Sequence, residues 1–313
     1  MTALYDHTLI IGIGLIGSSL ALAIKEAGLS GHISVADANI DHLTAAQKLS
    51  LGDSYHESAV EPAKTADLIV LCVPVGVMPS VVKEIADQMK PGATLSDTGS
   101  VKESVVDGLK GLMKPSVNFI PGHPVAGTEQ SGPSAGFAGL FKDRWCILTP
   151  LEDTDQVALE CLTELWQRLG SKVDVMDAKH HDLVLAITSH VPHLIAYNIV
   201  GTASDLEQVT RSEVIKYSAG GFRDFTRIAA SDPTMWRDVF LNNKDAVLEM
   251  LGRFSEDLTA LQRAIRWGDG EALHDLFTHT RDIRRRIVDA GQDSDAADFG
   301  RHHNDDGQDD QER

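Results

Sequence analysis

A glycine-rich turn between a predicted strand and a predicted helix constrains this chain more than any other feature. Residues 8–12 form an apolar run typical of a buried parallel strand, and residues 14–27 are typical of the helix that follows. Between them, Gly12 permits a tight turn, Gly14 lets a ligand approach the backbone, and Gly17 lets the helix pack close to the strand. This order of strand, GxGxxG turn and helix predicts a dinucleotide-binding βαβ unit.

An acidic residue at the end of the second predicted strand indicates which dinucleotide binds. The strand at 32–37 ends in Asp37, about 20 residues after the glycines, where its carboxylate would accept hydrogen bonds from a ribose and repel a 2′-phosphate. No basic residue follows Asp37 immediately, so the sequence favours NAD over NADP. The plainer alternative is a structural glycine turn beside a surface aspartate. The predicted cofactor-binding residues are Gly12, Gly14, Leu15, Ile16, Gly17, Asp37, Val73, Pro74, Asp97 and Thr98.

Strands and helices alternate as far as residue 176. Further strands are predicted at 67–73, 93–97, 117–120, 145–149 and 172–176, with helices at 77–89, 102–113 and 156–169. The Gly- and Ser-rich segment 128–142 is expected to form a surface excursion or lid. Such alternation predicts an α/β domain built on a doubly wound parallel sheet, with ligands at the carboxyl ends of its strands.

Two loops at those carboxyl ends carry reactive side chains. After the strand at 117–120, Pro124 biases His123 away from helical geometry, which predicts an extended loop. The loop 97–102 is expected to place the hydroxyl of Ser100 and the ammonium of Lys102 at the mouth of the same crevice. Plainer alternatives are a solvated His123 and a helix-capping Ser100.

The second half of the chain shows only helical patterns. Helices are predicted at 178–203, 234–241, 241–267 and 271–290. The stretch 183–200 is apolar on all sides, which predicts burial on several sides and hence mutual burial in a homodimer. Pro192 frees the carbonyl of Thr188 within it. We expect His190 to be a satisfied core histidine and His193 to face a pocket.

Charge and cysteine usage narrow the partners and the compartment. A formal net charge of −18 argues against nucleic acid and anionic membranes as partners. Cys72, Cys146 and Cys161 lack any CxxC spacing, and no signal peptide is recognisable, which favours a reducing, cytoplasmic setting. The acidic residues 291–313 contain one large apolar residue, Phe299, and are expected to be disordered. The predicted domains are 1–176 (NAD-binding), 177–290 (all-helical) and 291–313 (tail).

Four motifs in this order make a specific resemblance to a known family. They are Asp97-Thr-Gly-Ser-Val-Lys, Gly122-His-Pro-Val-Ala-Gly-Thr-Glu, Ser189-His-Val-Pro-His and Gly220-Gly-Phe-Arg-Asp-Phe-Thr-Arg-Ile-Ala. Over about residues 7–286 the chain resembles the prephenate/arogenate (cyclohexadienyl) dehydrogenases of tyrosine biosynthesis. The resemblance implies a Rossmann-type domain followed by an all-α C-terminal dimerisation domain. It also implies oxidation of a cyclohexadienol by NAD with loss of the ring carboxylate, and no metal.

The resemblance also implies roles for individual residues. His123 would accept the hydrogen bond from the ring hydroxyl as a base tuned near neutral pH, and Ser100 would orient both. Arg227 would hold the ring carboxylate through its planar guanidinium, and His193 would lie in the substrate pocket. Further matches are Glu129, Arg223 and Asp224, which would gate the site, and Trp236, which would line the pocket. Arg223 stands where some relatives have lysine.

Two other readings stay open at this point. A β-hydroxyacid dehydrogenase would share the plan of two domains, but it places a catalytic lysine on its long helix, and residues 183–200 contain none. An NAD-sensing module would use the same glycine turn without needing a histidine, a serine and an arginine at one crevice. The choice between prephenate and arogenate is not decided by the residues.

Overall fold

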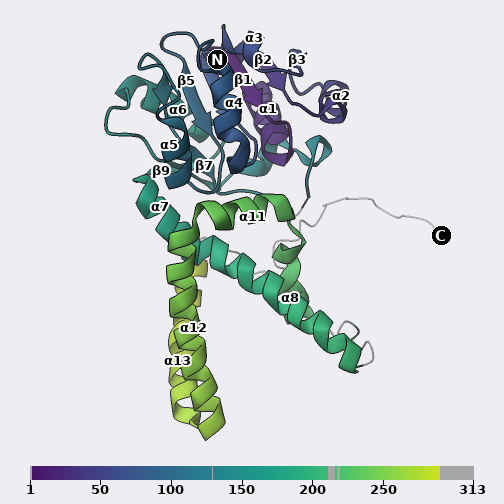
Figure 1. The fold of residues 1–313 in the computed structure, drawn as a ribbon, viewed down its shortest axis with the longest axis vertical. Coiled ribbons are helices and arrows are strands. Elements are labelled where there is room, and N and C mark those ends of the chain that lie inside the picture. The colour runs from purple at the N-terminus through teal and green to yellow at the C-terminus, as the bar shows by residue number, and fades with distance from the viewer. Residues whose placement is uncertain (1, 129, 211–215, 217–218, 290–313) are drawn as a thin grey trace, which may run out of the picture. The chain divides into compact units, whose positions relative to one another are not determined.

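The computed structural model describes residues 2–128, 130–210, 216 and 219–289 (Figure 1). It divides into two compact units, the first made of residues 1–218 and 225–250, the second beginning with 219–224 and continuing from 251. Glu129 and the acidic tail 291–313 lie outside the described residues, so the predictions made for them are not addressed by the structure.

The first unit is built on a six-stranded sheet. Its strands are β1 (Tyr5–Ile11), β2 (Ser30–Ala36), β3 (Ser54–His56), β4 (Leu68–Leu71), β5 (Thr94–Asp97) and β6 (Asn118–Phe119). Their order is β3-β2-β1-β4-β5-β6 and every neighbouring pair is parallel. The order reverses between β1 and β4, which creates a crevice at the carboxyl ends of these two strands. The predicted doubly wound parallel sheet is confirmed.

Helices cover this sheet because its strands are apolar on both faces. The helices of this region are α1 (Leu15–Ala27), α2 (Ile40–Lys48), α3 (Val60–Ala63), α4 (Met78–Ile85), α5 (Glu103–Leu109) and α6 (Gln156–Arg168). Successive side chains of a strand point to opposite faces. Accordingly Ile10 of β1 packs in one buried cluster with Leu20 and Ile24, whereas Leu9 packs in the other with Val82.

The strand pattern after residue 120 forms a second, smaller sheet, which the sequence did not reveal. It comprises β7 (Gly122–Pro124), β8 (Trp145–Leu148) and β9 (Lys172–Val175), with β7 antiparallel to β8 and β9 parallel to it. The expectation of a loop at His123 is therefore wrong, because His123 lies in β7 opposite Ile147. Pro124 is tolerated there because β7 is an edge strand, where a missing N–H costs no ladder hydrogen bond.

Residues 133–141, within the segment 128–142, are partly packed, whereas residues 130 and 131 are exposed at the surface. The segment contains two 3-10 turns, η2 (Pro133–Ala135) and η3 (Ala138–Phe141). Leu140 and Phe141 are buried in the same cluster as Leu20, and the backbone N–H of Phe137 donates to Ser19 Oγ at 3.1 Å. These contacts hold the segment against α1.

The long apolar helix is interrupted once. It consists of α7 (Ala178–Leu185), a π-helical turn η4 (Ala186–His190) and α8 (Val191–Thr210). Pro192 explains the interruption, because it has no backbone N–H to donate to the carbonyl of Thr188. The backbone therefore widens into a π-turn just before Pro192. The predicted helix at 178–203 is present, but with a π-turn at the position of the histidine motif.

This helix carries apolar side chains that the single chain does not cover. Ile187 and Ile199 are 48% and 40% exposed, so the predicted burial on several sides is wrong within one chain. By length and composition, the span Ala178–Asp205 could cross a membrane, and 28% of its most apolar window is buried. Its polar side chains Ser189, His190 and His193 fall in the middle of that span, where a bilayer would leave them poorly solvated.

The remaining described elements are η1 (Val75–Val77), α10 (Gly220–Thr226), η5 (Arg227–Ala230), α11 (Pro233–Asn242), α12 (Lys244–Trp267) and α13 (Gly270–Asp289). Of these, α11 belongs to the first unit and packs near the carboxyl end of β4. Asp232 caps α11 by accepting from the N–H of Met235 at 2.8 Å, as the Asp-Pro pair predicts. A Cβ on Gly76 would lie 3.0 Å from Asp238 Oδ2, and Trp236 joins the buried cluster around β4. Thus α11 lies against η1, the turn that follows β4.

Candidate active site

The glycine turn has the geometry of a cofactor cradle, meaning the open backbone at Gly14 between β1 and α1. Gly12 has φ of 92°, and a Cβ there would lie 2.5 Å from the carbonyl oxygen of Cys72. A Cβ on Gly17 would lie 2.0 Å from the carbonyl oxygen of Gly12, whereas one on Gly14 would meet nothing within 4 Å. Gly14 is also the N-cap of α1 and offers no side-chain acceptor to the first N–H groups of that helix. The cradle therefore fits a pyrophosphate, which those N–H groups would bind.

Asp37 lies directly beside this cradle. Its Oδ2 accepts from the N–H of Ile13 at 2.9 Å, and its Oδ1 accepts from the N–H of Asn39 at 2.8 Å. His42 Nδ1 lies 3.4 Å from Asp37 Oδ2. The carboxylate is thus fixed at the carboxyl end of β2, where a ribose bound with its pyrophosphate on the cradle would reach it.

His123 lies at the start of a buried chain of hydrogen bonds. Its Nδ1 is 2.8 Å from Nε2 of His181, and Nδ1 of His181 is 2.8 Å from Oδ1 of Asp182. The Asp182 carboxylate accepts from the backbone N–H of Lys102 at 2.7 Å and of Glu103 at 2.9 Å. This chain joins β7, α7 and the start of α5. His181 and Asp182 were not predicted, and the only signal for them was a polar doublet just before an apolar helical stretch.

A buried ion pair fixes the strand that carries His123. The ammonium of Lys102 pairs with Asp97 Oδ2 and donates to the carbonyl oxygen of Gly122 at 2.7 Å, and both side chains are fully buried. Asp97 also accepts from the N–H of Gly99 at 2.8 Å and of Gly122 at 3.3 Å. The expectation that the Lys102 ammonium lies at the mouth of the crevice is wrong, because the ammonium is buried in an ion pair with the Asp97 carboxylate. A contact of Asp97 with the cofactor stays a prediction.

Burial keeps His123 neutral. Desolvation, followed by the charges of His181, Lys102 and His190, holds the pKa of His123 well below 6.5. The expected near-neutral pKa is therefore wrong for this structure. Burial also lowers the pKa of His190 to about 4. His190 Nδ1 lies 3.1 Å from Nδ2 of Asn243, whereas its buried Nε2 has no hydrogen-bond partner among the described residues. The predicted core histidine is therefore buried as expected, but it is satisfied at one nitrogen only.

Three other predicted residues lie together on the helical side of the first unit. The ring of His193 stacks on that of Trp236, with centroids 3.7 Å apart and planes 25° apart. Its Nδ1 donates to the carbonyl oxygen of Ser189 at 2.8 Å. Burial lowers the pKa of His193, the hydrogen bond to Ser189 opposes this, and the charge of Arg227 lowers the pKa further. Arg227 begins η5, which packs against α8, the helix that carries His193. Trp236 is buried and Arg227 is exposed.

The structure does not test the roles predicted for four further residues. Ser100 is half-buried at the carboxyl end of β5, and among the described residues no hydrogen bond joins it to His123. Arg223 and Asp224 belong to the second unit, where Arg223 Nε lies 3.5 Å from Asp224 Oδ1. Glu129 lies outside the described residues. Their roles stay predictions. Val73 and Pro74 follow β4 at its carboxyl end, and Thr98 follows β5. Their contacts with the cofactor stay predictions.

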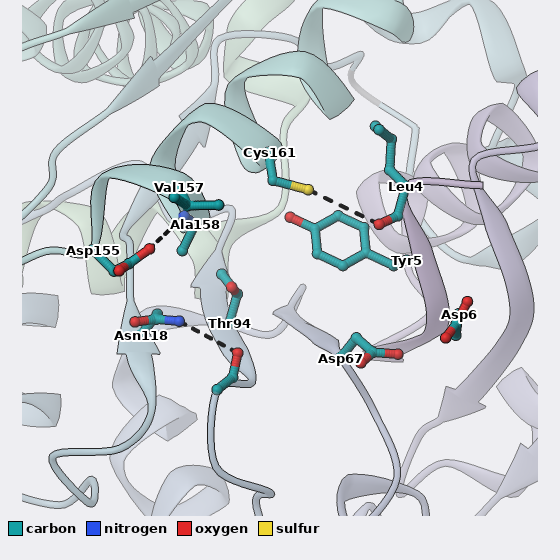
Figure 2. A pocket seen from close by; sticks show the side chains of 11 residues that line it. Leu4, Tyr5, Asp6, Asp67, Thr94, Asn118, Asp155, Val157, Ala158 and Cys161 are labelled. Atoms are coloured by element: carbon teal, nitrogen blue, oxygen red, sulfur yellow. Dashed lines mark hydrogen bonds between the residues drawn. The ribbon is translucent and has the colours of Figure 1, made fainter. Parts of the chain in front are cut away.

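One cavity lies at the amino ends of the strands, opposite the end where this chemistry is expected. Figure 2 shows it lined by Tyr5, Asp67, Thr94 and Asn118, which stand at the amino ends of β1, β4, β5 and β6. Its volume of about 330 Å³ does not make it the cofactor site, because parallel sheets bind ligands at the carboxyl ends. Across the residues that the structure describes, no group of three or more His, Cys, Asp or Glu could hold a metal ion.

Comparison with known proteins agrees with this geometry. Residues 20–175 match the family model for the prephenate dehydrogenase nucleotide-binding domain, and residues 177–279 match that for the prephenate dehydrogenase dimerization domain. A cyclohexadienyl dehydrogenase from Zymomonas mobilis is 42% identical over 280 residues, covering 90% of this chain and 95% of the relative.

Two solved structures share the fold over most of their length. Prephenate dehydrogenase from Aquifex aeolicus, in complex with hydroxyphenyl propionate and NAD+, superimposes with a TM-score of 0.85 at 33% identity, covering 90% of this chain and 98% of that one. Synechocystis arogenate dehydrogenase gives a TM-score of 0.75 at 26% identity, covering 90% and 99%. Both domains, the sequence identity and the shared fold show that this chain belongs to the prephenate dehydrogenase family.

Proposed function

We propose that this chain is an NAD-dependent dehydrogenase that oxidatively decarboxylates prephenate to 4-hydroxyphenylpyruvate, arogenate to tyrosine, or both. The observation that carries the proposal is the buried, neutral His123, held near the carboxyl ends of the sheet whose first turn forms the cofactor cradle. Family membership and the NAD named in the Aquifex aeolicus complex support the same reaction. Residues 183–200 contain no lysine, so no observation favours a β-hydroxyacid dehydrogenase.

The proton and electron balance of this reaction suits a single histidine base. Bound NAD+ would accept the hydride from the carbinol carbon. His123 would take the hydroxyl proton while the electron pair of the O–H bond forms a carbonyl. Loss of the ring carboxylate as CO2 then leaves its bonding electrons in the ring, which becomes aromatic, and the oxygen takes a proton back. His123 can return the proton it accepted, so no metal or second base is needed.

The substrate carboxylates require cationic or hydrogen-bonding partners at the other end of the site. Arg227 is the proposed partner of the ring carboxylate, because a guanidinium can bind a carboxylate through two parallel hydrogen bonds. His193 and Trp236, stacked on each other, are proposed to form the wall of the pocket. Ser100 is proposed to orient the ring hydroxyl, and Glu129, Arg223 and Asp224 to gate the entrance.

The uncovered helical surface supports a homodimer. Ile187, Ile199 and Val200 are between 39% and 48% exposed, and the matched family model for residues 177–279 is described as a dimerization domain. We propose that a second copy covers this face, and that the domains divide as 1–176, 177–290 and 291–313. A cytoplasmic location remains the prediction from cysteine usage, and Cys72, Cys146 and Cys161 are free.

The direct test is NADH formation with prephenate and with arogenate, measured side by side at saturating NAD+. Turnover of either substrate supports the proposal, and the ratio of the two kcat/KM values assigns the side-chain specificity. If protein shown to bind NAD+ turned over neither substrate, the proposal would be overturned. An NAD-sensing module or a hydroxyacid dehydrogenase would then be favoured.

A further inference from the structure

We propose that His181 and Asp182 act as positioning residues that fix the tautomer of His123, so that its Nε2 is always the basic nitrogen. The inference deepens the proposed function and rests on it, because it concerns how His123 is prepared to accept a proton. It is carried by three hydrogen-bonded groups: Nδ1 of His123, the ring of His181, and the Asp182 carboxylate.

The direction of the chain is set at its Asp182 end. Backbone N–H groups can only donate, and two of them, from Lys102 and Glu103, point at the two oxygens of this carboxylate at 2.7 and 2.9 Å. Asp182 is almost completely buried and is held by these donors as an acceptor. The remaining contact of its Oδ1, at 2.8 Å, must therefore be filled by a donor, which is Nδ1–H of His181.

The two imidazoles then have one consistent arrangement. A neutral histidine carries a single N–H, so a proton on Nδ1 of His181 leaves its Nε2 as an acceptor. The facing Nδ1 of His123, 2.8 Å away, must carry its own proton and donate it. Consequently Nε2 of His123 keeps its lone pair and is the nitrogen left to accept the proton of the substrate hydroxyl.

The opposite tautomer is disfavoured by burial. A proton on Nε2 of His123 would leave two lone pairs facing each other across the 2.8 Å contact, or two acceptors facing each other at Asp182. His181 is fully buried, so water cannot replace the missing donor. An unsatisfied buried polar group costs about 1–3 kcal/mol, which corresponds to roughly a tenfold to hundredfold preference for the productive tautomer.

The same chain stabilises the imidazolium that forms when His123 accepts a proton. The charged groups that face the two rings are the Lys102 ammonium, the carboxylates of Asp97 and Asp182, and the ring of His190. The Lys102 ammonium opposes protonation of His123, and its ion pair with Asp97 weakens this opposition. Asp182, acting through His181, is therefore the anion that offsets the positive charge developing on His123.

The first experiment compares steady-state kinetics of His181→Leu and Asp182→Asn with those of wild type and of His180→Leu, an exposed histidine on the same helical turn. The proposal predicts that kcat falls roughly 10²- to 10⁴-fold in the two test variants, the range that general acid–base catalysis contributes. KM and the Kd for NAD+ should change by no more than about twofold. The His180→Leu control should match wild type.

A double mutant separates positioning from folding. If His181 acts only through His123, then His123→Asn/His181→Leu should be no slower than His123→Asn alone. A structural role for His181 would instead add its loss to that of His123, and this additive result would overturn the proposal. Circular dichroism and NAD+ binding of each variant report whether its fold is retained.

A spectroscopic measurement on the wild-type protein needs no turnover, and a folded His123→Asn variant is used only to assign the signals. With 15N-labelled histidine, two-bond 15N–1H correlation spectra distinguish Nδ1–H from Nε2–H imidazoles, and loss of one signal in His123→Asn assigns His123 among the 13 histidines. The proposal predicts Nδ1–H for both His123 and His181 at neutral pH. An Nε2–H signal for His123 would overturn it. This result stands even if no cyclohexadienol is oxidised, so failure of the positioning role and failure of the proposed function are distinguishable.

Discussion

Two clusters on the first unit are built in opposite ways. The first, here called the proton-accepting cluster after its proposed role, comprises His123, His181, Asp182, Lys102 and Asp97. It is buried throughout and joined by directed hydrogen bonds and one ion pair. The second, called the carboxylate-binding cluster after its proposed role, comprises His193, Trp236 and Arg227. Its two rings are stacked and its cation is exposed. His190 touches both, since its ring lies 6.0 Å from that of Trp236 and its charge lowers the pKa of His123.

The two clusters differ in burial and bonding because their proposed tasks need different degrees of rigidity. A base must hold one nitrogen at one place in a fixed protonation state, and buried, fully bonded surroundings provide this. A cation that captures an anionic substrate has to remain accessible until the substrate arrives. Changes to the first cluster should therefore affect stability and kcat, whereas changes to the second should affect KM.

The largest effect that separates the clusters is expected for Lys102→Met. It leaves the Asp97 carboxylate buried without its cation and removes the donor to the Gly122 carbonyl. Breaking a buried pair on one side destabilises a protein by about 3–5 kcal/mol, measured here by urea denaturation. Lys110→Met, which breaks an exposed pair with Asp107, is the control and should cost at most about 0.5–1 kcal/mol. Equal losses for both variants would contradict the role assigned to the buried pair.

The next effect concerns pH and the histidine shared by both clusters. Burial lowers the pKa of His190 from 6.5 to about 4, so between these values the unfolded chain binds more protons than the folded one. Stability should therefore fall as pH falls from 6.5 towards 4. His190→Leu should remove about 2–3 kcal/mol of that loss when unfolding is compared at pH 7 and pH 4.5. Identical pH slopes for wild type and variant would show that His190 does not titrate as its burial implies.

A smaller effect is expected in the carboxylate-binding cluster. Arg227→Ala should raise the substrate KM by roughly tenfold to a hundredfold, because a hydrogen bond to a charged group is worth about 1.5–3 kcal/mol. The value of kcat should change much less, and stability should remain within about 0.5 kcal/mol of wild type. Arg168→Ala on α6, whose guanidinium lies 3.4 Å from Glu164, is the matched control. An unchanged KM would remove Arg227 from the pocket.

The smallest effect lies outside both clusters, at the cofactor cradle. Asp37→Ala removes the acceptor predicted to bind the ribose and also the hydrogen bond from the N–H of Ile13. We expect the ratio of kcat/KM for NAD+ over NADP+ to fall by about tenfold. Asp41→Ala, in the first turn of α2, should leave the ratio unchanged. A constant ratio in Asp37→Ala would exclude this residue as the determinant of cofactor choice.

Local sequence signals predicted the cofactor cradle and the parallel sheet well. The spacing of Gly12, Gly14 and Gly17 indicates that each position has no room for a side chain or must leave the backbone open. A short apolar run such as β4 is typical of a buried strand. The small sheet was missed because β7 has only three residues and contains a proline, which removes the pattern of a strand.

Contacts between distant segments could not be predicted in this way. Lys102 and Asp182 are 80 positions apart, and His123 and His181 are 58 apart, so nothing local links them. The sequence around Lys102 predicts a solvated cation. In the tertiary fold its ammonium instead contacts the Asp97 carboxylate and the Gly122 carbonyl. The motif resemblance supplied His193, Trp236 and Arg227, but not the stacking that joins the first two.

The most direct test of the account measures His123→Asn for both NADH formation and NAD+ binding. Asparagine can hydrogen-bond but cannot accept the hydroxyl proton at neutral pH. The account predicts a kcat at least 10³-fold lower, within the range of general-base contributions, with a Kd for NAD+ within about twofold of wild type. Retained turnover would contradict the assignment of His123 as the base. Lost NAD+ binding would show instead that His123 is structural.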